Sequence, residues 1–279
     1  MTKKVAAGAK GAATAKGPDV PEKTYQGLRR FNLIMGLLHL VQGVLMVVLS
    51  FTLGDIKTYA ISTTVLNFDV AAQKLVPVLK QAFSLPFGPA VGAFLLVSAI
   101  AHFSLATFGY KWYVANLKKG MNPARFYEYA LSSSIMIVLI GLLTGVSDLG
   151  ALIAMFGVNA SMNLFGLLME LHNQTTKKTD WTSYIFGCFA GIIPWIVIVA
   201  YFVLSITSAA PDSGPPSFVY GIVASLFVFF NVFAVNMYLQ YKKVGPWKNY
   251  LFGERMYIIL SLVAKTLLAW QVFAGVLAP

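Results

Sequence analysis

The chain has 279 residues, of which 58% are hydrophobic and only 11% charged, and its mean hydropathy is +0.72. Soluble domains carry about 25% charged residues, so a chain of this composition could not solvate its own surface, and a soluble protein is excluded. Lys and Arg number 21 against 10 Asp and Glu, which gives a net charge of +11. In a soluble chain this excess would suggest nucleic-acid binding, whereas in a membrane chain it reports topology, so we expect no nucleic-acid partner.

The chain begins with a basic stretch that has no apolar centre. Residues 1–24 hold lysines among Ala and Gly and lack the apolar segment of a cleavable signal peptide. We therefore predict a disordered basic cytoplasmic arm over residues 1–24 and a membrane domain over residues 25–279. The single cysteine, Cys188, has no partner within the chain, so the sequence predicts neither a disulfide framework nor a thiolate metal cluster.

A bilayer core requires about 20 apolar residues per helix. Seven runs of about this length follow in chain order, at Phe31–Leu53, Phe87–Tyr110, Phe126–Val146, Leu149–Leu171, Tyr184–Ile206, Phe218–Tyr241 and Met256–Leu277. Only Ser147 and Asp148 join the third run to the fourth, which predicts a tight antiparallel pair of helices. The connection between the first two runs, about Gly54–Pro86, is far longer, and long loops are often functional.

The basic residues can be sorted by side, because alternate connections lie on opposite sides of the membrane. Only Lys57, Lys74 and Lys80 fall on the side away from the N-terminus, and Lys265 falls inside the seventh run; the others lie on the N-terminal side. The positive-inside rule then predicts a cytoplasmic N-terminus and, with seven spans, an extracellular C-terminus. Topology leaves Lys265 unexplained.

Lys265 and Glu128 are ionisable residues inside predicted spans. Such a residue costs about 2.5 to 3.5 kcal/mol at a helix centre, and it usually faces the bundle interior and serves a function. At about 1.5 Å per residue, Lys265 lies roughly 15 Å below the cytoplasmic edge. Glu128 lies in the same half, about 9 Å beyond a helix start marked by Asn122 as N-cap and Pro123. These depths allow the two side chains to meet.

A structural ion pair is one interpretation of this placement, and an interfacial Glu128 beside a neutral Lys265 is another. A chemical role is the third. A desolvated lysine gives up its proton more readily and is then a nucleophile toward aldehydes, with which it forms a Schiff base. A protonated Schiff base in an apolar bundle needs a carboxylate counter-ion, and Glu128 can fill that role.

Five motifs on these helices form one pattern. They are Ser261-Leu262-Val263-Ala264-Lys265, Glu128-Tyr129-Ala130-Leu131-Ser132-Ser133-Ser134, Phe156-Gly157-Val158-Asn159-Ala160-Ser161, Gly191-Ile192-Ile193-Pro194-Trp195 and Phe229-Phe230-Asn231. Over about residues 28–277 the chain resembles the heliorhodopsins, retinal-binding microbial rhodopsins with inverted topology. The resemblance implies an all-α membrane protein with the seven-transmembrane-helix rhodopsin bundle, and it agrees with the topology predicted from charge.

The resemblance also implies the roles of individual residues. Lys265 would carry all-trans retinal as a protonated Schiff base, with Glu128 as the sole counter-ion and with Ser261 and Ser98 in supporting positions. His39 and His102 would line a proton-accepting cavity on the cytoplasmic side of the retinal, since histidine titrates near neutrality. Histidines that only bond to a neighbouring helix are the alternative. Without a third ligand the pair predicts no metal site.

Five further residues are predicted walls of the retinal pocket, although aromatic and Met side chains on membrane helices often only pack or face lipid. They are Trp195, Phe230, Met136, Asn159 and Met162. By the same resemblance, the long first extracellular loop forms a small β-structure and supports a homodimer.

A proton pump generally needs further carboxylates along its path, and only Glu128 lies in the predicted membrane interior, with Glu170 and Asp148 at span ends. We therefore predict a light-sensing protein of the cell membrane, not an enzyme, with a slow photocycle and no net ion pumping. Two alternatives stay open. One is a light-driven proton transporter or channel, and the other is a light-dependent regulator of a cytoplasmic partner enzyme, acting through the basic cytoplasmic face.

Overall fold

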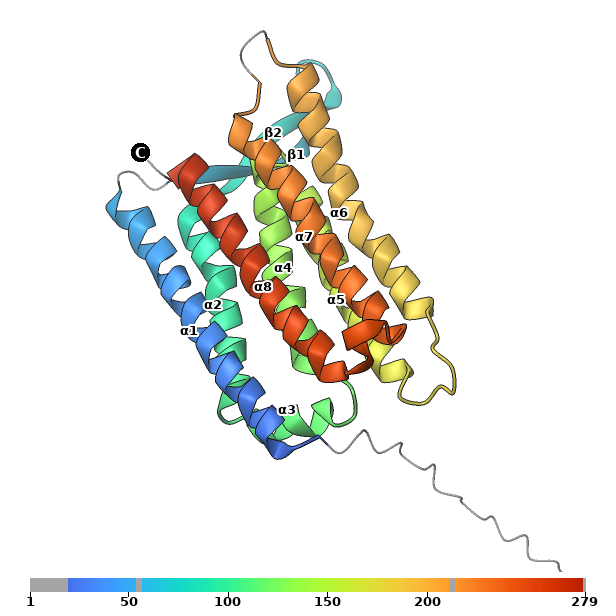
Figure 1. The fold of residues 1–279 in the computed structure, drawn as a ribbon. Coiled ribbons are helices and arrows are strands. Elements are labelled where there is room, and N and C mark those ends of the chain that lie inside the picture. The colour runs from blue at the N-terminus through green and yellow to red at the C-terminus, as the bar shows by residue number, and fades with distance from the viewer. Residues whose placement is uncertain (1–19, 54–56, 211–213, 278–279) are drawn as a thin grey trace, which may run out of the picture.

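The computed structural model describes residues 20–53, 57–210 and 214–277, and it forms a bundle of long helices capped at one end by a β-hairpin (Figure 1). The long helices are α1 (Glu22–Thr52), α2 (Phe87–Ala106), α4 (Pro123–Leu143), α5 (Leu149–His172), α6 (Thr182–Thr207), α7 (Ser217–Tyr241) and α8 (Tyr250–Val272). Shorter elements are α3 (Tyr110–Leu117), the 3₁₀ turn η1 (Gly245–Lys248) and the π turn η2 (Phe273–Leu277). Seven of these helices are long and apolar enough to cross a membrane, as predicted.

Several helices start or stop away from the predicted bounds. Helix α1 begins at Glu22, inside the predicted arm, most of which lies outside the described residues. The second predicted span is broken near Gly109, so that α2 ends at Ala106 and α3 begins at Tyr110. Helix α8 begins at Tyr250 instead of Met256. The early starts of α1 and α8 have one cause, because hydropathy reports the apolar part of a helix, whereas the polar turns at its end are equally helical. The break after α2 has another, because the apolar run continues through the turn at Thr107–Gly109.

Side-chain caps fix the start of α4 and of α5. Asn122 is the N-cap of α4, where its side chain accepts a hydrogen bond from the backbone N–H of Arg125, and Pro123 is the first helical residue. Asp148 caps α5 by accepting from the N–H of Ala151 at 2.8 Å. The connection between α4 and α5 is short, but it is longer than the two residues predicted, because α4 ends at Leu143 and leaves residues 144–148 between the helices.

The first long connection forms an antiparallel hairpin of β1 (Thr58–Asp69) and β2 (Lys74–Pro86), with an irregularity in register between Ile61 and Ser62. This agrees with the small β-structure predicted for the loop. The base of the hairpin is fixed to the bundle, since the N–H of Ser62 donates to the carbonyl of Ser147 at 2.9 Å and Ile61 is buried.

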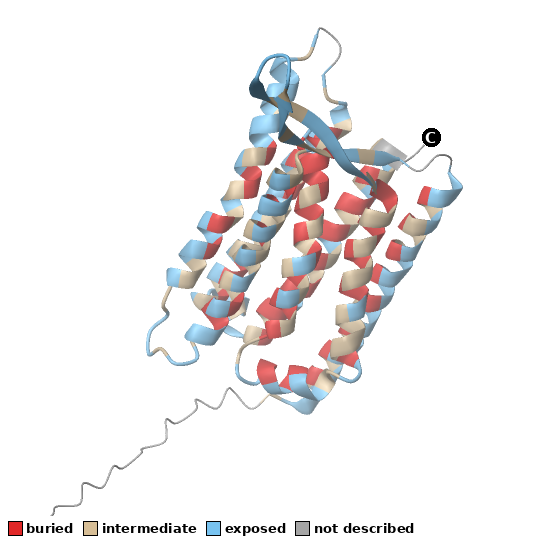
Figure 2. Cartoon of the chain, turned by 180° about the vertical axis from the view of Figure 1, so that it is seen from behind, coloured by how far each residue is buried: buried red, intermediate tan, exposed pale blue. Residues whose placement is uncertain are grey.

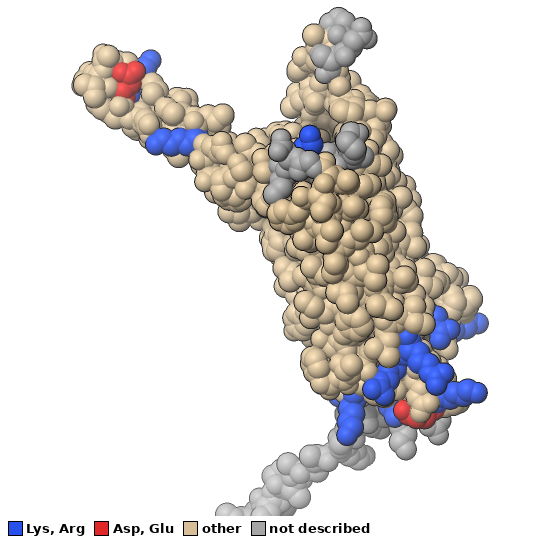
Figure 3. Space-filling view, turned by 90° about the vertical axis from the view of Figure 1, so that its left-hand side faces the viewer, with Lys and Arg blue, Asp and Glu red and all other residues tan. Residues whose placement is uncertain are grey.

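Buried residues face the inside of the bundle, and the outer surface is largely exposed apolar side chain (Figure 2). Such a surface suits lipid and not water. Charges gather at the ends (Figure 3). We call the end that carries α3 and the start of α1 the basic end, and the opposite one the hairpin end, whose basic residues in the described parts are Lys57, Lys74 and Lys80.

Candidate functional site

Lys265 and Glu128 form an ion pair inside the bundle. Nζ of Lys265 on α8 lies 2.7 Å from Oε1 of Glu128 on α4, and the two side chains are 4% and 9% exposed. Glu128 is therefore enclosed by the helices and does not lie on the outer surface of the protein. Charges buried this deeply persist only when they are paired and hydrogen-bonded.

Two serines complete the surroundings of the amine. Nζ of Lys265 donates to the hydroxyl of Ser98 at 2.6 Å and to that of Ser261 at 2.9 Å. Ser98 in turn donates to Oε1 of Glu128 at 2.6 Å. The three N–H groups of an ammonium thus have three acceptors, contributed by α2, α4 and α8. The structure brings together all four residues predicted for this site.

Tyr129 also belongs to the site, and the sequence analysis missed it. Its ring lies 5.1 Å from Nζ of Lys265, within reach of a cation–π contact. Its hydroxyl donates to the backbone carbonyl of Tyr257 at 2.9 Å, which fixes the ring against α8. In the sequence, only the position of Tyr129 directly after Glu128 could have indicated that it belongs to the site.

A cavity begins at Lys265 and continues toward α6 and α7. The part beside the amine has a volume of about 50 Å³, and the adjoining part has about 330 Å³. Both parts share the lining residues Tyr129, Met162, Asn163, Phe230 and Phe233. Aromatic and Met side chains make up half of each lining, and few of the lining groups are polar, as is usual for sites that hold an apolar ligand.

The predicted pocket walls fall into two groups. Met136 lines the smaller part, Trp195 the larger one, and Met162 and Phe230 line both. Asn159 lines neither. It is buried against α4, where its amide donates to the hydroxyls of Ser133 and Ser134, and Asn163, one helical turn later, lines the cavity instead.

His39 and His102 lie side by side with parallel rings whose centroids are 5.5 Å apart. Nδ1 of His102 lies 2.8 Å from Oδ1 of Asn32. Because an amide oxygen only accepts, Nδ1 carries a proton there. Both ring nitrogens of His39 are buried without a hydrogen-bond partner among the described residues. Neither histidine lines the two cavity parts that reach Lys265 or its neighbours.

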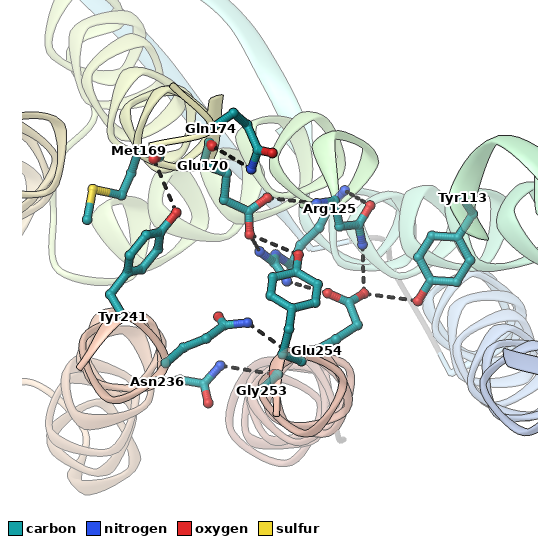
Figure 4. A network of polar contacts seen from close by, with 12 residues as sticks. Tyr113, Arg125, Met169, Glu170, Gln174, Asn236, Tyr241, Gly253 and Glu254 are labelled. Carbon is teal, nitrogen blue, oxygen red and sulfur yellow. Dashed lines mark hydrogen bonds and ion pairs between the residues drawn. The ribbon is translucent and has the colours of Figure 1, made fainter. Parts of the chain in front are cut away.

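A second buried polar cluster lies nearer the basic end, where one guanidinium meets two carboxylates (Figure 4). Arg125 on α4 pairs with Glu170 on α5 at 2.5 Å and with Glu254 on α8. All three residues are at most 5% exposed. The sequence analysis had treated Arg125 as a loop charge and Glu170 as a span end, so it missed this cluster.

Uncharged donors satisfy the remaining carboxylate oxygens of the cluster. Tyr250 donates to Glu170 at 3.0 Å, Tyr113 donates to Glu254 at 3.0 Å, and Asn122 donates to both through its backbone and side-chain nitrogens. Burial, with the nearby carboxylate of Glu254, raises the pKa of Tyr113 well above its ordinary value, so its hydroxyl remains a donor. The cluster ties α3, α4, α5 and α8 together.

The described residues hold no group of three or more His, Cys, Asp or Glu that could bind a metal ion. The sequence model of the Heliorhodopsin family matches residues 28–277. No curated protein gives a significant match to the chain. The match covers nearly the whole chain, and the helices are those of a multi-pass membrane protein. The chain therefore belongs to the heliorhodopsin family and is a retinal-binding rhodopsin.

Proposed function

We propose that the protein is a light sensor in which all-trans retinal is joined to Lys265, with Glu128 as counter-ion, and that it runs a slow photocycle without net ion transport. The observation that carries this proposal is a buried amine, paired with one carboxylate, at the end of an apolar cavity. A merely structural ion pair would not require an aromatic-lined space beside the amine.

The residues present fit this cofactor. The cavity next to Lys265 is apolar apart from a few hydroxyl and amide groups, and it widens toward Trp195 and Phe230. An elongated apolar aldehyde has room to lie there with its reactive end at the amine. Retinal, when bound, supplies the absorption of visible light and a double bond that isomerises.

The protein's own residues then neutralise one positive charge, and they orient and accept one proton. Glu128 neutralises the positive charge on Nζ of Lys265, which would otherwise be unpaired in an apolar bundle. Ser98 and Ser261 orient the proton on Nζ. Glu128 and the His39–His102 pair are the candidate acceptors when that proton leaves, because a carboxylate oxygen and an imidazole nitrogen with a free lone pair can each take a proton.

The absence of net pumping is proposed from the distribution of charge. In the described parts of the helices, no Asp, Glu, Lys or Arg lies between the level of Lys265 and the hairpin end until Asp148, the cap of α5. A proton leaving Nζ therefore has no ionisable relay toward that end. The expected outcome is a local proton transfer that reverses in the dark.

The first test is absorption. Adding all-trans retinal to the apoprotein should give a visible band, and Lys265→Ala should not give one. A wild type without a band, or a Lys265→Ala variant that keeps it, would overturn the proposal. Photocurrent recording in expressing cells then separates a sensor from a transporter or channel, since a steady light-dependent current contradicts the sensor.

A light-dependent regulator of a cytoplasmic enzyme is the second candidate function. It is favoured by the density of Lys and Arg at the basic end (Figure 3), which offers a surface for an acidic partner. Capture of the same protein in light but not in darkness would support it. Capture that does not respond to light would not.

We also propose that the basic end faces the cytoplasm and that the protein forms a homodimer. The first follows from the positive-inside rule. The second is supported by the hairpin, which exposes Leu66, Phe68, Leu75 and Leu79, each more than half exposed, since large exposed apolar patches commonly mark interfaces. Replacing Leu79 with Glu should shift the purified protein from dimer to monomer on size-exclusion chromatography with light scattering.

A further inference from the structure

Helix α2 ends at the level of the membrane surface at the basic end. It runs from Phe87 to Ala106 and has 20 residues, which correspond to about 30 Å at 1.5 Å per residue. The hydrocarbon core of a bilayer is also about 30 Å thick. Because α2 follows directly on β2 at the hairpin end, it has crossed the whole core when it reaches Ala106. The segment that follows α2 therefore lies among the lipid headgroups.

The chain leaves α2 by a tight turn at Gly109 and continues sideways as α3. The N–H of Gly109 donates to the carbonyl of Ser104 at 2.8 Å. A Cβ at Gly109 would lie 2.8 Å from the same carbonyl oxygen, so the turn requires glycine. Helix α3, from Tyr110 to Leu117, then lies across the end of the bundle (Figure 1). It thus follows the membrane surface.

The inner side of α3 is fixed to the bundle. Tyr113, Val114 and Leu117 are buried, and they belong to one apolar cluster with residues of α1 and α8. The hydroxyl of Tyr113 also donates to Glu254 on α8 at 3.0 Å. These contacts set the rotation of α3 about its own axis, and they determine which of its side chains face outward.

The outer side of α3 combines aromatic rings with lysines. Phe108, in the turn before α3, is 88% exposed, the highest value for a large apolar side chain in the described parts of the chain. Trp112, four positions later, is 48% exposed. The neighbouring exposed residues are Lys111, Ala115, Lys118 and Lys119. We call these four, with Phe108 and Trp112, the α3 face. Aromatic side chains beside lysines are typical of helices that lie at a membrane surface.

No carboxylate lies within ion-pair distance of these lysines in the described parts of the chain. The segment from Thr107 to Gly120 contains neither Asp nor Glu. Glu22, an acid at the same end on α1, takes part in none of the four ion pairs. Lys118 lies over the ring of Tyr25, a contact that leaves its charge in place. Positive charge at this level attracts the phosphates of anionic lipids.

We propose that the α3 face binds the membrane surface at the basic end, with Phe108 and Trp112 in the headgroup layer and the three lysines on anionic phospholipid headgroups. Lipid contact accounts for large apolar side chains that water would not favour, and the lysines select lipids by charge. A soluble acidic protein would match the charge but would not explain the level at which α3 lies. The proposal does not rest on the light-sensing function, because it uses neither Lys265 nor retinal.

The first test measures whether Phe108 lies in lipid. A nitroxide is attached to the full-length protein at Phe108→Cys or, as a control, at Thr175→Cys, an exposed position between α5 and α6 at the same end. Both variants carry Cys188→Ser. In nanodiscs of phosphatidylglycerol and phosphatidylcholine, the probe at position 108 should collide more with oxygen, which concentrates in lipid, than with a water-soluble nickel chelate. The probe at position 175 should show the opposite order. If Phe108→Cys does not fold, Ala115→Cys tests the same face.

The second test measures selectivity for charge. The full-length protein is stripped of lipid in detergent and offered equal amounts of phosphatidylglycerol and phosphatidylcholine, and native mass spectrometry counts the lipids retained. Replacing Lys111 and Lys119 together with Gln should weaken the retention of phosphatidylglycerol about fivefold for each lysine removed. Replacing Lys177 and Lys178 with Gln is the matched control, since it removes the same charge from exposed positions between α5 and α6. This control should change retention little.

Two results would overturn the proposal. One is a probe at position 108 that meets the nickel chelate as often as the probe at position 175, which would place the α3 face in water and favour an acidic protein as its partner. The other is an equal loss of phosphatidylglycerol in the two double variants, which would indicate a diffuse basic surface. Neither readout needs retinal, so failure here is distinct from failure of the light-sensing proposal.

Discussion

The amine of Lys265 lies 2.6 Å from the hydroxyl oxygen of Ser98, and the same hydroxyl donates to Glu128. Ser98 thus bridges the two partners of the ion pair by hydrogen bonds. It lies on α2, which carries neither of the two charges. A hydroxyl can serve both partners because it donates one proton and accepts at its lone pairs. The pair therefore depends on the packing of α2 as well as on α4 and α8.

We predict that Ser98→Ala lowers the free energy of unfolding by about 1 to 3 kcal/mol, because it removes a donor from a buried carboxylate and an acceptor from a buried amine. Reversible unfolding in detergent would measure this. Ser104→Ala is the control on the same helix, since Ser104 is bonded to its own helix at Ile100. An equal effect of both changes would show that Ser98 does not support the pair.

Glu128→Gln should shift the visible band of the retinal-loaded protein to longer wavelength. The amide cannot neutralise the charge on Nζ of Lys265, and a weaker counter-ion stabilises the excited state relative to the ground state. The absorption spectrum measures the shift. Glu170→Gln, which changes a carboxylate outside this site, is the control. A band that moves with Glu170→Gln and not with Glu128→Gln would mean that another carboxylate is the counter-ion.

Removing Arg125 should cost much more than removing a surface charge. Arg125→Gln would leave the carboxylates of Glu170 and Glu254 buried without their cation, and breaking such a pair costs about 3 to 5 kcal/mol. Arg30→Gln, an identical change at an exposed position on α1, should stay within about 0.5 kcal/mol. Thermal unfolding of both variants compares them, and similar melting temperatures would refute a stabilising role of the cluster.

The close contact of α1 and α2 should make Gly92 intolerant of a side chain. A Cβ there would lie 2.5 Å from Cγ2 of Val47 and 3.0 Å from the backbone oxygen of Gly43. We expect Gly92→Ala to destabilise the protein by about 1 to 3 kcal/mol. Gly157→Ala, where a Cβ meets nothing within 4 Å, should be neutral or stabilising, because Ala favours helix. The same unfolding assay checks both, and the opposite order of stability would contradict the packing described.

The sequence determined the parts of this structure that depend on position along the helix axis. Hydropathy located seven spans, and counting residues placed Lys265 and Glu128 at similar depths, where they indeed meet. These inferences succeed because each helix adds a fixed rise per residue and because the bilayer penalises charge by depth. The family resemblance added Ser98 and Ser261, which lie at the same site.

Only the tertiary structure determined which side chains on each helix face the cavity and which face a neighbouring helix. Asn159 and Asn163 are one turn apart, yet only Asn163 lines the cavity, because the amide of Asn159 is bonded to serines on α4. Arg125 lies at a span end, as a loop charge would, but the packing of α5 and α8 encloses it between two carboxylates. The larger cavity part, lined by residues of α6 and α7, likewise arises from the way these helices are spaced. Such features depend on which helices become neighbours, and a single sequence does not record that.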